Sequence, residues 1–262
     1  MSTTADYLAA YDAQLRTEAA SAIAVTRLGP LYLATYLGGR GWITYGALDD
    51  DEGTAIAGLV PAALTHFGSD SEIARVEWKT RDHDHAPGLH EALVRHGFVA
   101  GEPESIMIGE AQLLAVDAPL PAGVSLRRVT SESDVRAMCA MESVVFDESE
   151  DMSDEMAEQL LHRLSLDDGM ELWVAEADGA IVSAGRLEPV AGTDFAGIWG
   201  GGTLPQWRHQ GIYRALTAAR ARSALSLGKT LIQSDSTEFS RPILERAGLV
   251  KVSTTTPYEW RR

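Results

Sequence analysis

The stretch "LPQWRHQGIYRALTAARARSALSLGK" (residues 204–229) decides the fold of this chain. Its proline ends the preceding strand, and Gly211 lets the backbone turn tightly into a helix. Ile212 and Leu216 recur at helical spacing and predict a face that packs on a sheet. The first N–H groups of that helix have no partner within it, and Arg208 stands beside them. We therefore expect an anion site of pyrophosphate size, the alternative being an ordinary turn with solvated charges.

Strands and helices alternate around this segment. Alternation with period two predicts strands, and apolar repeats near 3.6 predict helices. In order, we expect a strand, two helices, three strands, the helix after Gly211, a strand, a helix and a last strand, over residues 124–130, 131–146, 153–166, 171–178, 180–190, 194–204, 212–228, 229–236, 239–248 and 249–260. This order predicts an α/β (α+β) fold with a mixed sheet flanked by helices.

This order of elements, with "RHQGIY" (208–213) between "TLP" and "RPILERAGL", resembles the GCN5-related N-acetyltransferase (GNAT) superfamily. The resemblance covers residues 124–260 and implies a sheet with splayed central strands and acetyl-coenzyme A as cofactor. It implies that the pyrophosphate contacts Arg208, His209, Gln210, Gly211, Ile212 and Tyr213. It also implies that the pantetheine arm passes Gly200–Gly202, three glycines that indicate a bulge. A backbone N–H at Thr203 or Leu204 would then polarise the acetyl carbonyl.

Two positions depart from the family pattern. Tyr213 stands where glycine or alanine is usual, so its side chain must share space with the cofactor. Leu244 stands where many members have the tyrosine that protonates the departing thiolate. That proton must then come from Ser236, Ser240, Tyr213 or water.

A base is needed because a primary amine, with a pKa near ~10.4, arrives protonated. We select Glu142 and Asp235 as candidates, with Asp147 and Glu188 as alternatives, although each is also explained as a surface or capping group. Ser236 and Ser240 follow a strand where hydroxyls meet the pantetheine or the thiolate, and helix capping explains one of them equally well.

Composition excludes several classes of function. The net charge of −16 disfavours nucleic acid and attracts small cations. Cys139 is the single cysteine, so an internal disulfide and a cysteine metal cluster are excluded. We expect no metal, and we interpret "RDHDHAPG" (81–88) as a solvated turn. Without a secretory signal or a long apolar run, we expect a cytoplasmic protein with no membrane partner.

The amino-terminal half resembles a degenerate copy of the same design. A linker near residues 113–123 separates a degenerate GNAT-like domain, 1–115, from a catalytic domain, 116–262. In the first half, "GWITYGALD" resembles the cofactor strand, "EIARVEWKT" the next strand and "ESIMIGE" the final strand. Where the phosphate loop would stand, this half has "DDDEG" (49–53), whose carboxylates repel a pyrophosphate. We expect it to have a structural role or to shape the acceptor pocket.

The sequence therefore predicts an N-acetyltransferase that moves the acetyl group of acetyl-coenzyme A to a primary amine by direct attack in a ternary complex. The acceptor expected from the charge is a small cationic amine. A noncatalytic acyl-coenzyme A binding or regulatory protein is the alternative, whereas a nucleotide-dependent oxidoreductase lacks its glycine fingerprint. The identity of the acceptor and the oligomeric state stay open, a homodimer included.

Overall fold

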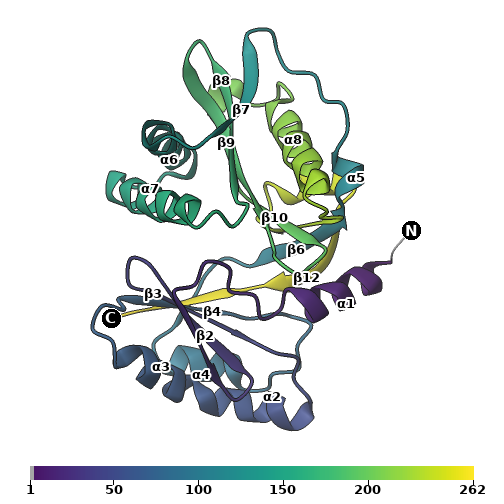
Figure 1. Ribbon diagram of the computed structural model, residues 1–262. Coiled ribbons are helices and arrows are strands. Elements are labelled where there is room, and N and C mark those ends of the chain that lie inside the picture. The colour runs from purple at the N-terminus through teal and green to yellow at the C-terminus, as the bar shows by residue number, and fades with distance from the viewer. Residues whose placement is uncertain (1–2) are drawn as a thin grey trace. The chain divides into compact units, whose positions relative to one another are not determined.

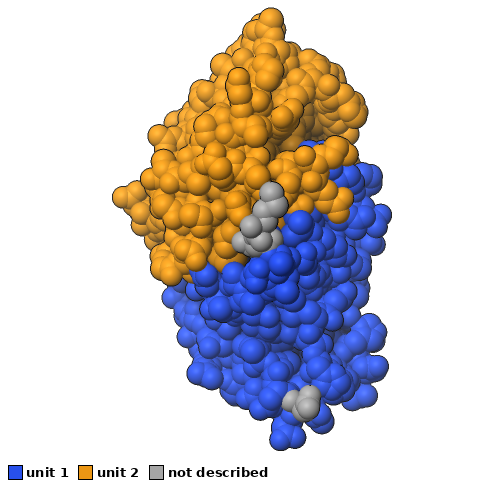
Figure 2. All heavy atoms as spheres, turned by 90° about the vertical axis from the view of Figure 1, so that its right-hand side faces the viewer, with its two compact units in different colours: residues 1–107, 235–243, 250–262 blue, residues 108–234, 244–249 orange. Residues whose placement is uncertain are grey.

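The computed structural model describes residues 3–262 and divides into two compact units. Unit 1 contains residues 1–107, 235–243 and 250–262, and unit 2 contains residues 108–234 and 244–249 (Figure 2). The sequence-based division between residues 115 and 116 stays a prediction, and the boundary of the units here is at residues 107 and 108. Two segments near the carboxyl terminus, residues 235–243 and 250–262, also belong to unit 1.

Unit 1 consists of the amino-terminal elements and the last two strands. Its helices are α1 (Thr4–Gln14), α2 (Asp50–Ile56), the 3-10 turn η1 (Ala57–Leu59), α3 (Val60–Gly68) and α4 (Leu89–Arg95). Its strands are β1 (Ala24–Leu28), β2 (Leu31–Tyr36), β3 (Arg40–Tyr45), β4 (Arg75–Lys79), β5 (Val99–Ala100), β12 (Val250–Thr255) and β13 (Pro257–Arg261). Trp78, Phe67, Ile43 and their neighbours form its apolar core.

Unit 2 holds the elements around the glycine-entered helix. Its helices are α5 (Ala111–Leu114), α6 (Glu132–Phe146), α7 (Glu150–Ser165), the 3-10 turn η2 (Pro205–Trp207) and α8 (Ile212–Ser226). Its strands are β7 (Val124–Val129), β8 (Glu171–Ala177), β9 (Ala180–Pro189) and β10 (Phe195–Thr203). The division between the units falls within β6 (Glu104–Glu110), β11 (Leu231–Ser236) and α9 (Arg241–Arg246).

The strands form two mixed sheets, which confirms the predicted fold class. The six-stranded sheet has the order β1-β2-β3-β4-β13-β5, and the seven-stranded sheet has the order β12-β6-β11-β10-β9-β8-β7. Each sheet contains a parallel pair: β3 with β4, and β10 with β11. These strands are the ones that the sequence matches between the two halves. The internal repeat is therefore present in the pairing as well as in the order of elements.

The last strand of each half lies in an unexpected place. The sequence predicts "ESIMIGE" as the closing strand of the first half and one strand over 249–260 for the second. Instead, β6 lies between β12 and β11, while the second segment divides into β12 and β13. β13 pairs antiparallel with β4, from Pro257↔Lys79 to Arg261↔Arg75. Local alternation identifies strands but carries no information on their partners, so this exchange could not be read from the pattern.

In unit 2, helices cover both faces of the sheet. α6 and α7 pack on one face and α8 on the other (Figure 1). α6 starts as predicted, because the Ser131 hydroxyl accepts a hydrogen bond from the Asp134 N–H at 3.2 Å. Cys139 is part of the core between α6, α7 and the sheet, and burial raises the pKa of its thiol to about 12. This layering brings one end of α6 and one end of α8 to β10.

The described residues, 3–262, contain neither a membrane-crossing helix nor a cluster of metal ligands. No helix among them combines the length and the apolar character needed to cross a bilayer. No group of three or more His, Cys, Asp or Glu side chains in that part of the chain could hold a metal ion.

Candidate active site at the glycine bulge of unit 2

The three consecutive glycines of β10 form the predicted bulge. The antiparallel register with β9 runs through Trp199↔Arg186 and resumes at Gly202↔Ala184. Two residues of β10, Gly200 and Gly201, therefore stand opposite one residue of β9. Gly200 has a φ of +59°, a conformation that side-chain-bearing residues rarely adopt. The bulge opens next to the end of the parallel pairing with β11, which runs from Phe195↔Leu231 to Gly197↔Gln233.

Thr203 and Leu204, the two predicted oxyanion donors, differ in their availability. The Leu204 N–H donates to the Val182 carbonyl at 3.0 Å, so it is already engaged. Thr203, one residue earlier in the same antiparallel register, then has its N–H and C=O directed away from β9. Its carbonyl accepts a hydrogen bond from Arg208 Nε at 3.0 Å on that side. Thr203 is thus the better placed of the two to polarise a carbonyl.

The segment before α8 has the backbone of an anion-binding loop. His209 and Gly211 both have positive φ, 62° and 83°, within a run of exposed residues. Gly211 is the N-cap of α8 and supplies no side-chain cap, so the first N–H groups of the helix are left for another acceptor. Successive N–H groups in alternating conformations form a concave site for anions. A Cβ at Gly211 would approach nothing closer than the Pro119 carbonyl, at 3.8 Å, so the approach is open.

The other predicted cofactor residues surround this loop. Gln210 is exposed, and its amide donates to the Gln206 carbonyl at 3.2 Å. Ile212 is buried in the core beneath α8. Tyr213 is half-buried, and its ring lies against Gly201 of the bulge: a Cβ at Gly201 would lie 2.7 Å from its Cε2 and 3.1 Å from its hydroxyl. The tyrosine that departs from the family pattern therefore occupies the bulge side of the loop.

The contact between Gly201 and Tyr213 gives a direct test of the bulge. Gly201→Ala should force the tyrosine ring aside, at a cost of about 1–3 kcal/mol in unfolding free energy. Coenzyme A affinity or acetyl transfer should fall together with stability if the ring borders the site. Chemical denaturation and a thiol-release assay measure the two effects. Gly68→Ala is the control, because no atom lies within 4 Å of a Cβ there and the backbone of Gly68 is not in the left-handed region. An unchanged Gly201→Ala protein would contradict the packing described.

Glu142 and Tyr213 lie on opposite sides of the bulge, because α6 and α8 cover opposite faces of the sheet. Glu142 belongs to α6, is 6% exposed, and its Oε1 has no hydrogen-bond partner among the described atoms. A Cβ at Gly200 would lie 3.0 Å from that oxygen and 3.5 Å from Arg186 Nη1. Only a glycine lets the carboxylate approach the backbone so closely.

Burial gives Glu142 the acidity of a base that works near neutral pH. Its pKa is raised to about 7, chiefly because burial disfavours the charged form. Arg186 and Arg220 oppose this increase, whereas the negative charge of Glu148 adds to it. A buried carboxyl group with an unsatisfied oxygen is costly to keep and is a common feature of functional sites.

The two alternative carboxylates of this unit are in other environments. Asp147 is exposed and ends α6 with a left-handed backbone, φ 58°. Glu188 forms ion pairs with Arg163 and with Arg186, the second with an Oε1–Nε distance of 3.3 Å. Glu188 is therefore already committed to two cations, and Asp147 serves as a helix cap.

Three predicted site residues, Asp235, Ser236 and Ser240, fall in unit 1 by their contacts. Asp235 forms a short ion pair with Lys79 of β4, and both side chains are largely buried. Burial lowers the pKa of Lys79, but the adjacent Asp235 carboxylate and Tyr11 together outweigh burial, so the net shift of this pKa is upward. Ser236 is buried, and Ser240 lies in the turn before α9, where its hydroxyl faces the Thr237 carbonyl at 3.4 Å. Their catalytic roles stay predictions.

Leu244 is buried in unit 2, with 1% of its surface exposed. A tyrosine at this position would have to displace packed neighbours. This position therefore serves the core in the present chain.

Sequence reasoning did not select Arg186 and Arg220. Arg220 is 1% exposed and extends from α8 under β9, where a Cβ at Gly185 would lie 2.5 Å from its Nη1. The available signal was its place in the helix: Arg220 follows Tyr213 by two turns and Leu216 by four residues, so it lies on the face directed at the sheet. For Arg186, the alternation of apolar and polar residues along β9 gave no comparable indication that its side chain lies at the site.

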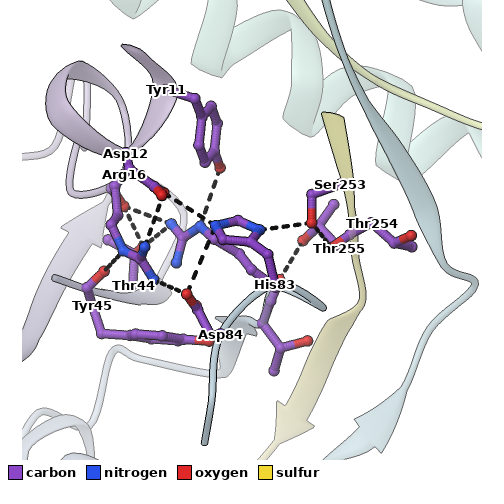
Figure 3. Close-up of polar contacts among 12 residues, drawn as sticks. Tyr11, Asp12, Arg16, Thr44, Tyr45, His83, Asp84, Ser253, Thr254 and Thr255 are labelled. Atoms are coloured by element: carbon purple, nitrogen blue, oxygen red, sulfur yellow. Dashed lines mark hydrogen bonds and ion pairs between the residues drawn. The ribbon is translucent and has the colours of Figure 1, made fainter. Parts of the chain in front are cut away.

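In unit 1, the corresponding end of the parallel pair is filled by the protein's own side chains. The β3–β4 register ends at Ile43↔Trp78. Just beyond it, Arg81 Nη2 donates to Thr44 Oγ1 at 2.6 Å, and Arg16 Nε donates to the Tyr45 carbonyl at 3.2 Å. Figure 3 shows Arg16 close to Asp12, Tyr45 and Asp84, with which it forms hydrogen bonds.

The helix start of unit 1 also differs from that of unit 2. Asp49 caps α2, and its carboxylate accepts a hydrogen bond from the Glu52 N–H at 2.8 Å. The side chain of Asp50 lies outside the described part of the structure. A carboxylate therefore already occupies the position at the helix start that a phosphate would need.

Comparisons with known proteins agree with this architecture. No family model and no curated protein matches the chain. Among solved structures, a GCN5-related N-acetyltransferase from Kribbella flavida covers 98% of this chain and 93% of its own, with a TM-score of 0.64 and 18% identity. A tandem GNAT protein from the clavulanic acid biosynthesis pathway covers 90% of this chain and 81% of its own, with a TM-score of 0.61 and 14% identity.

A third match is a GCN5-related N-acetyltransferase from Sphaerobacter thermophilus, which covers 88% of this chain and 76% of its own, with a TM-score of 0.61 and 15% identity. The likeness extends over both units in each case, and it confirms the repeat inferred from the order of elements. This chain therefore has the fold of the GCN5-related N-acetyltransferase superfamily in a tandem arrangement.

Proposed function

We propose that this chain transfers the acetyl group of acetyl-coenzyme A to a primary amine by direct attack in a ternary complex. The observation that carries the proposal is Glu142, a buried carboxyl group with an unpartnered oxygen at a glycine bulge. Its pKa of about 7 lets it accept a proton at neutral pH. A structural carboxylate in this position would be expected to have a hydrogen-bond or ion-pair partner.

The loop at Arg208–Tyr213 fits the cosubstrate. Its exposed positive-φ residues and uncapped helix start suit a pyrophosphate, and the Arg208 side chain adds a positive charge. Acetyl-coenzyme A would supply the reactive thioester. The N–H of Thr203, directed away from β9, is the candidate donor to the carbonyl oxygen that becomes negative during attack.

Glu142 would prepare the acceptor. It removes a proton from the ammonium or from the attacking amine, directly or through one water, and holds that proton on its carboxyl group. The amine nitrogen forms a bond to the acetyl carbon as the bond from that carbon to sulfur breaks. The electron pair of the broken bond stays on sulfur. The acylated nitrogen releases its remaining excess proton and the thiolate takes up one proton, so that an ammonium and a thioester give an amide, a thiol and the proton held on Glu142.

Tyr213 is the protein hydroxyl that we favour for this last step. Its ring lies against Gly201, on the same bulge as Glu142. Ser236, Ser240 and water remain the alternatives, and Leu244 has no proton to give.

Thiol release with a panel of primary amines tests the function. The expected result is acetylation of at least one amine class by the wild-type protein, with strong loss in Glu142→Gln. Binding of acetyl-coenzyme A without transfer to any amine would support the alternative, a noncatalytic acyl-coenzyme A binding protein.

The acceptor class that we propose is a small cationic amine. A net charge of −16 concentrates cations near the surface and disfavours polyanions. The value of kcat/KM for a polyamine or an aminoglycoside should exceed that for an N-acyl amino acid. It should fall by roughly threefold or more when salt is raised well above 0.1 M, because the screening length is then under about 10 Å. An anionic or neutral best substrate with salt-independent rates would refute this steering.

A further inference from the structure

Arg220 is a buried arginine placed under the bulge. It comes from α8, is 1% exposed, and its hydrogen bonds go to uncharged oxygens. Nη1 lies 3.1 Å from the Arg186 carbonyl and 3.4 Å from the Trp199 carbonyl. Nη2 lies 3.2 Å from Thr217 Oγ1 of its own helix. An arginine used only for packing could be replaced by an apolar side chain at lower desolvation cost.

The two carbonyls that Arg220 binds belong to one cross-strand pair. Trp199↔Arg186 is the last regular pair of β10 and β9 before the bulge. The guanidinium then fills the space at Gly185, the residue of β9 opposite the extra residues of β10. A Cβ at position 185 would lie 2.5 Å from Nη1, so the guanidinium would have to shift to make room. Arg220 therefore fixes the point at which β10 leaves its regular path.

The charge of Arg220 also acts on the ionisation of Glu142. The groups that face this carboxyl are Arg186 from β9, Arg220 from α8 and Glu148 from the segment after α6. Arg186 is partly neutralised by Glu188, at an Nε–Oε1 distance of 3.3 Å. Burial lowers the pKa of Arg220 and outweighs the opposing effects of Tyr213 and Glu142. Glu142 and Arg220 each favour the charged form of the other.

We propose that Arg220 is a positioning residue for Glu142: it holds the bulge in shape through the carbonyls of Arg186 and Trp199, and its positive charge favours the ionised carboxylate. The inference rests on the proposed function only for the role of Glu142 in catalysis. It gives α8 a second role: besides binding phosphate at its first residues, the helix positions Glu142 through Arg220. The two tasks should be separable, because the loop residues and Arg220 lie at different turns of the helix.

The test compares Arg220→Met and Arg220→Lys with the wild type. In Arg220→Met the loss of the cation should move the rising limb of kcat/KM with pH to higher pH. A displacement of about one pH unit corresponds to about tenfold lower kcat/KM on that limb. Arg220→Lys keeps the positive charge, so the rise of kcat/KM with pH should stay near its wild-type position. The maximal kcat/KM should be lower, because the hydrogen bonds to the Arg186 and Trp199 carbonyls are lost. Coenzyme A affinity should stay within about twofold in both variants.

Arg222→Met is the matched control from the same helix. Its side chain is exposed and donates to the Val116 carbonyl at 2.9 Å, so the pH profile should not move. If Arg220→Met does not fold, Gly185→Ala displaces the guanidinium while keeping every charge, and kcat should still fall. An unchanged kcat in a folded Gly185→Ala protein would overturn the inference.

A second readout is independent of activity. The ¹³C resonance of the Glu142 carboxyl group, assigned by its absence in Glu142→Gln, reports the titration of that group directly. Its midpoint should rise in Arg220→Met and stay in place in Arg222→Met. If Arg220→Met changes neither the titration midpoint of Glu142 nor the rise of kcat/KM with pH, Arg220 has only a structural role. If no amine is acetylated, the proposed function fails, and the titration still decides this inference.

Discussion

Glu142→Gln should lower kcat for acetyl transfer by about 10²- to 10³-fold, within the usual contribution of a general base. Glutamine keeps the size of the side chain, so the core around α6 should stay intact and coenzyme A affinity should change by less than about twofold. The amide cannot accept the proton that the amine must lose. Steady-state kinetics and calorimetric titration of coenzyme A measure the two quantities separately.

The pH dependence follows from the raised pKa of Glu142, about 7. The active form is the carboxylate, so kcat/KM should rise as pH increases through about 7 and level off above it. The ionisation of the amine itself, near ~10.4, lies outside this window. Glu142→Gln should lose this limb. The exposed Glu148 provides a control of opposite sign: removing its charge in Glu148→Gln should lower the pKa of Glu142 and move the limb to lower pH.

A Glu142→Gln protein with more than about a third of the wild-type activity and the same limb would refute the assignment. The base would then be sought elsewhere, with Asp235 next in line. In that case Asp235→Asn should displace the limb. Circular dichroism and thermal unfolding of each variant show whether a loss of activity reflects misfolding.

The loop and the bulge could be predicted because their signals are local. A glycine before a helix, with an arginine three residues earlier, already specifies an uncapped helix start. Three glycines in a strand already specify a break in its pairing, and the break lies between Trp199 and Gly202. The tandem repeat could be recognised for the same reason, since each half repeats a local order of strands and helices.

The candidate base could not be singled out, because its distinguishing property is a matter of tertiary partners. Glu142 and Asp235 look alike in sequence, each near the end of a regular element. In the structure, Asp235 pairs with Lys79, a residue 156 positions away, whereas Glu142 Oε1 has no partner among the described atoms. The exchange of β6 and β13 is a similar case, since pairing over such separations is decided by the whole fold.

Arg208→Glu should weaken coenzyme A binding by about 10²-fold or more, which corresponds to about 2.7 kcal/mol. The wild-type side chain brings a positive charge to the loop and also donates to the Thr203 carbonyl at 3.0 Å. A charge-assisted hydrogen bond to a phosphate contributes roughly 1.5–3 kcal/mol, and reversal of the charge adds repulsion. Arg208→Lys should lie in between, because it keeps the charge but loses the planar group that bridges loop and strand.

Calorimetric titration should also give one coenzyme A site per chain. Unit 1 lacks the requirements for a second one, since Asp49 caps α2 and the end of its parallel pair is filled by Arg16 and Arg81. Glu52→Ala, at the start of α2, should therefore leave both stoichiometry and affinity unchanged. Two sites of similar affinity, or full binding by Arg208→Glu, would show that the helix start of α8 is not the phosphate site and that unit 1 is not a degenerate copy.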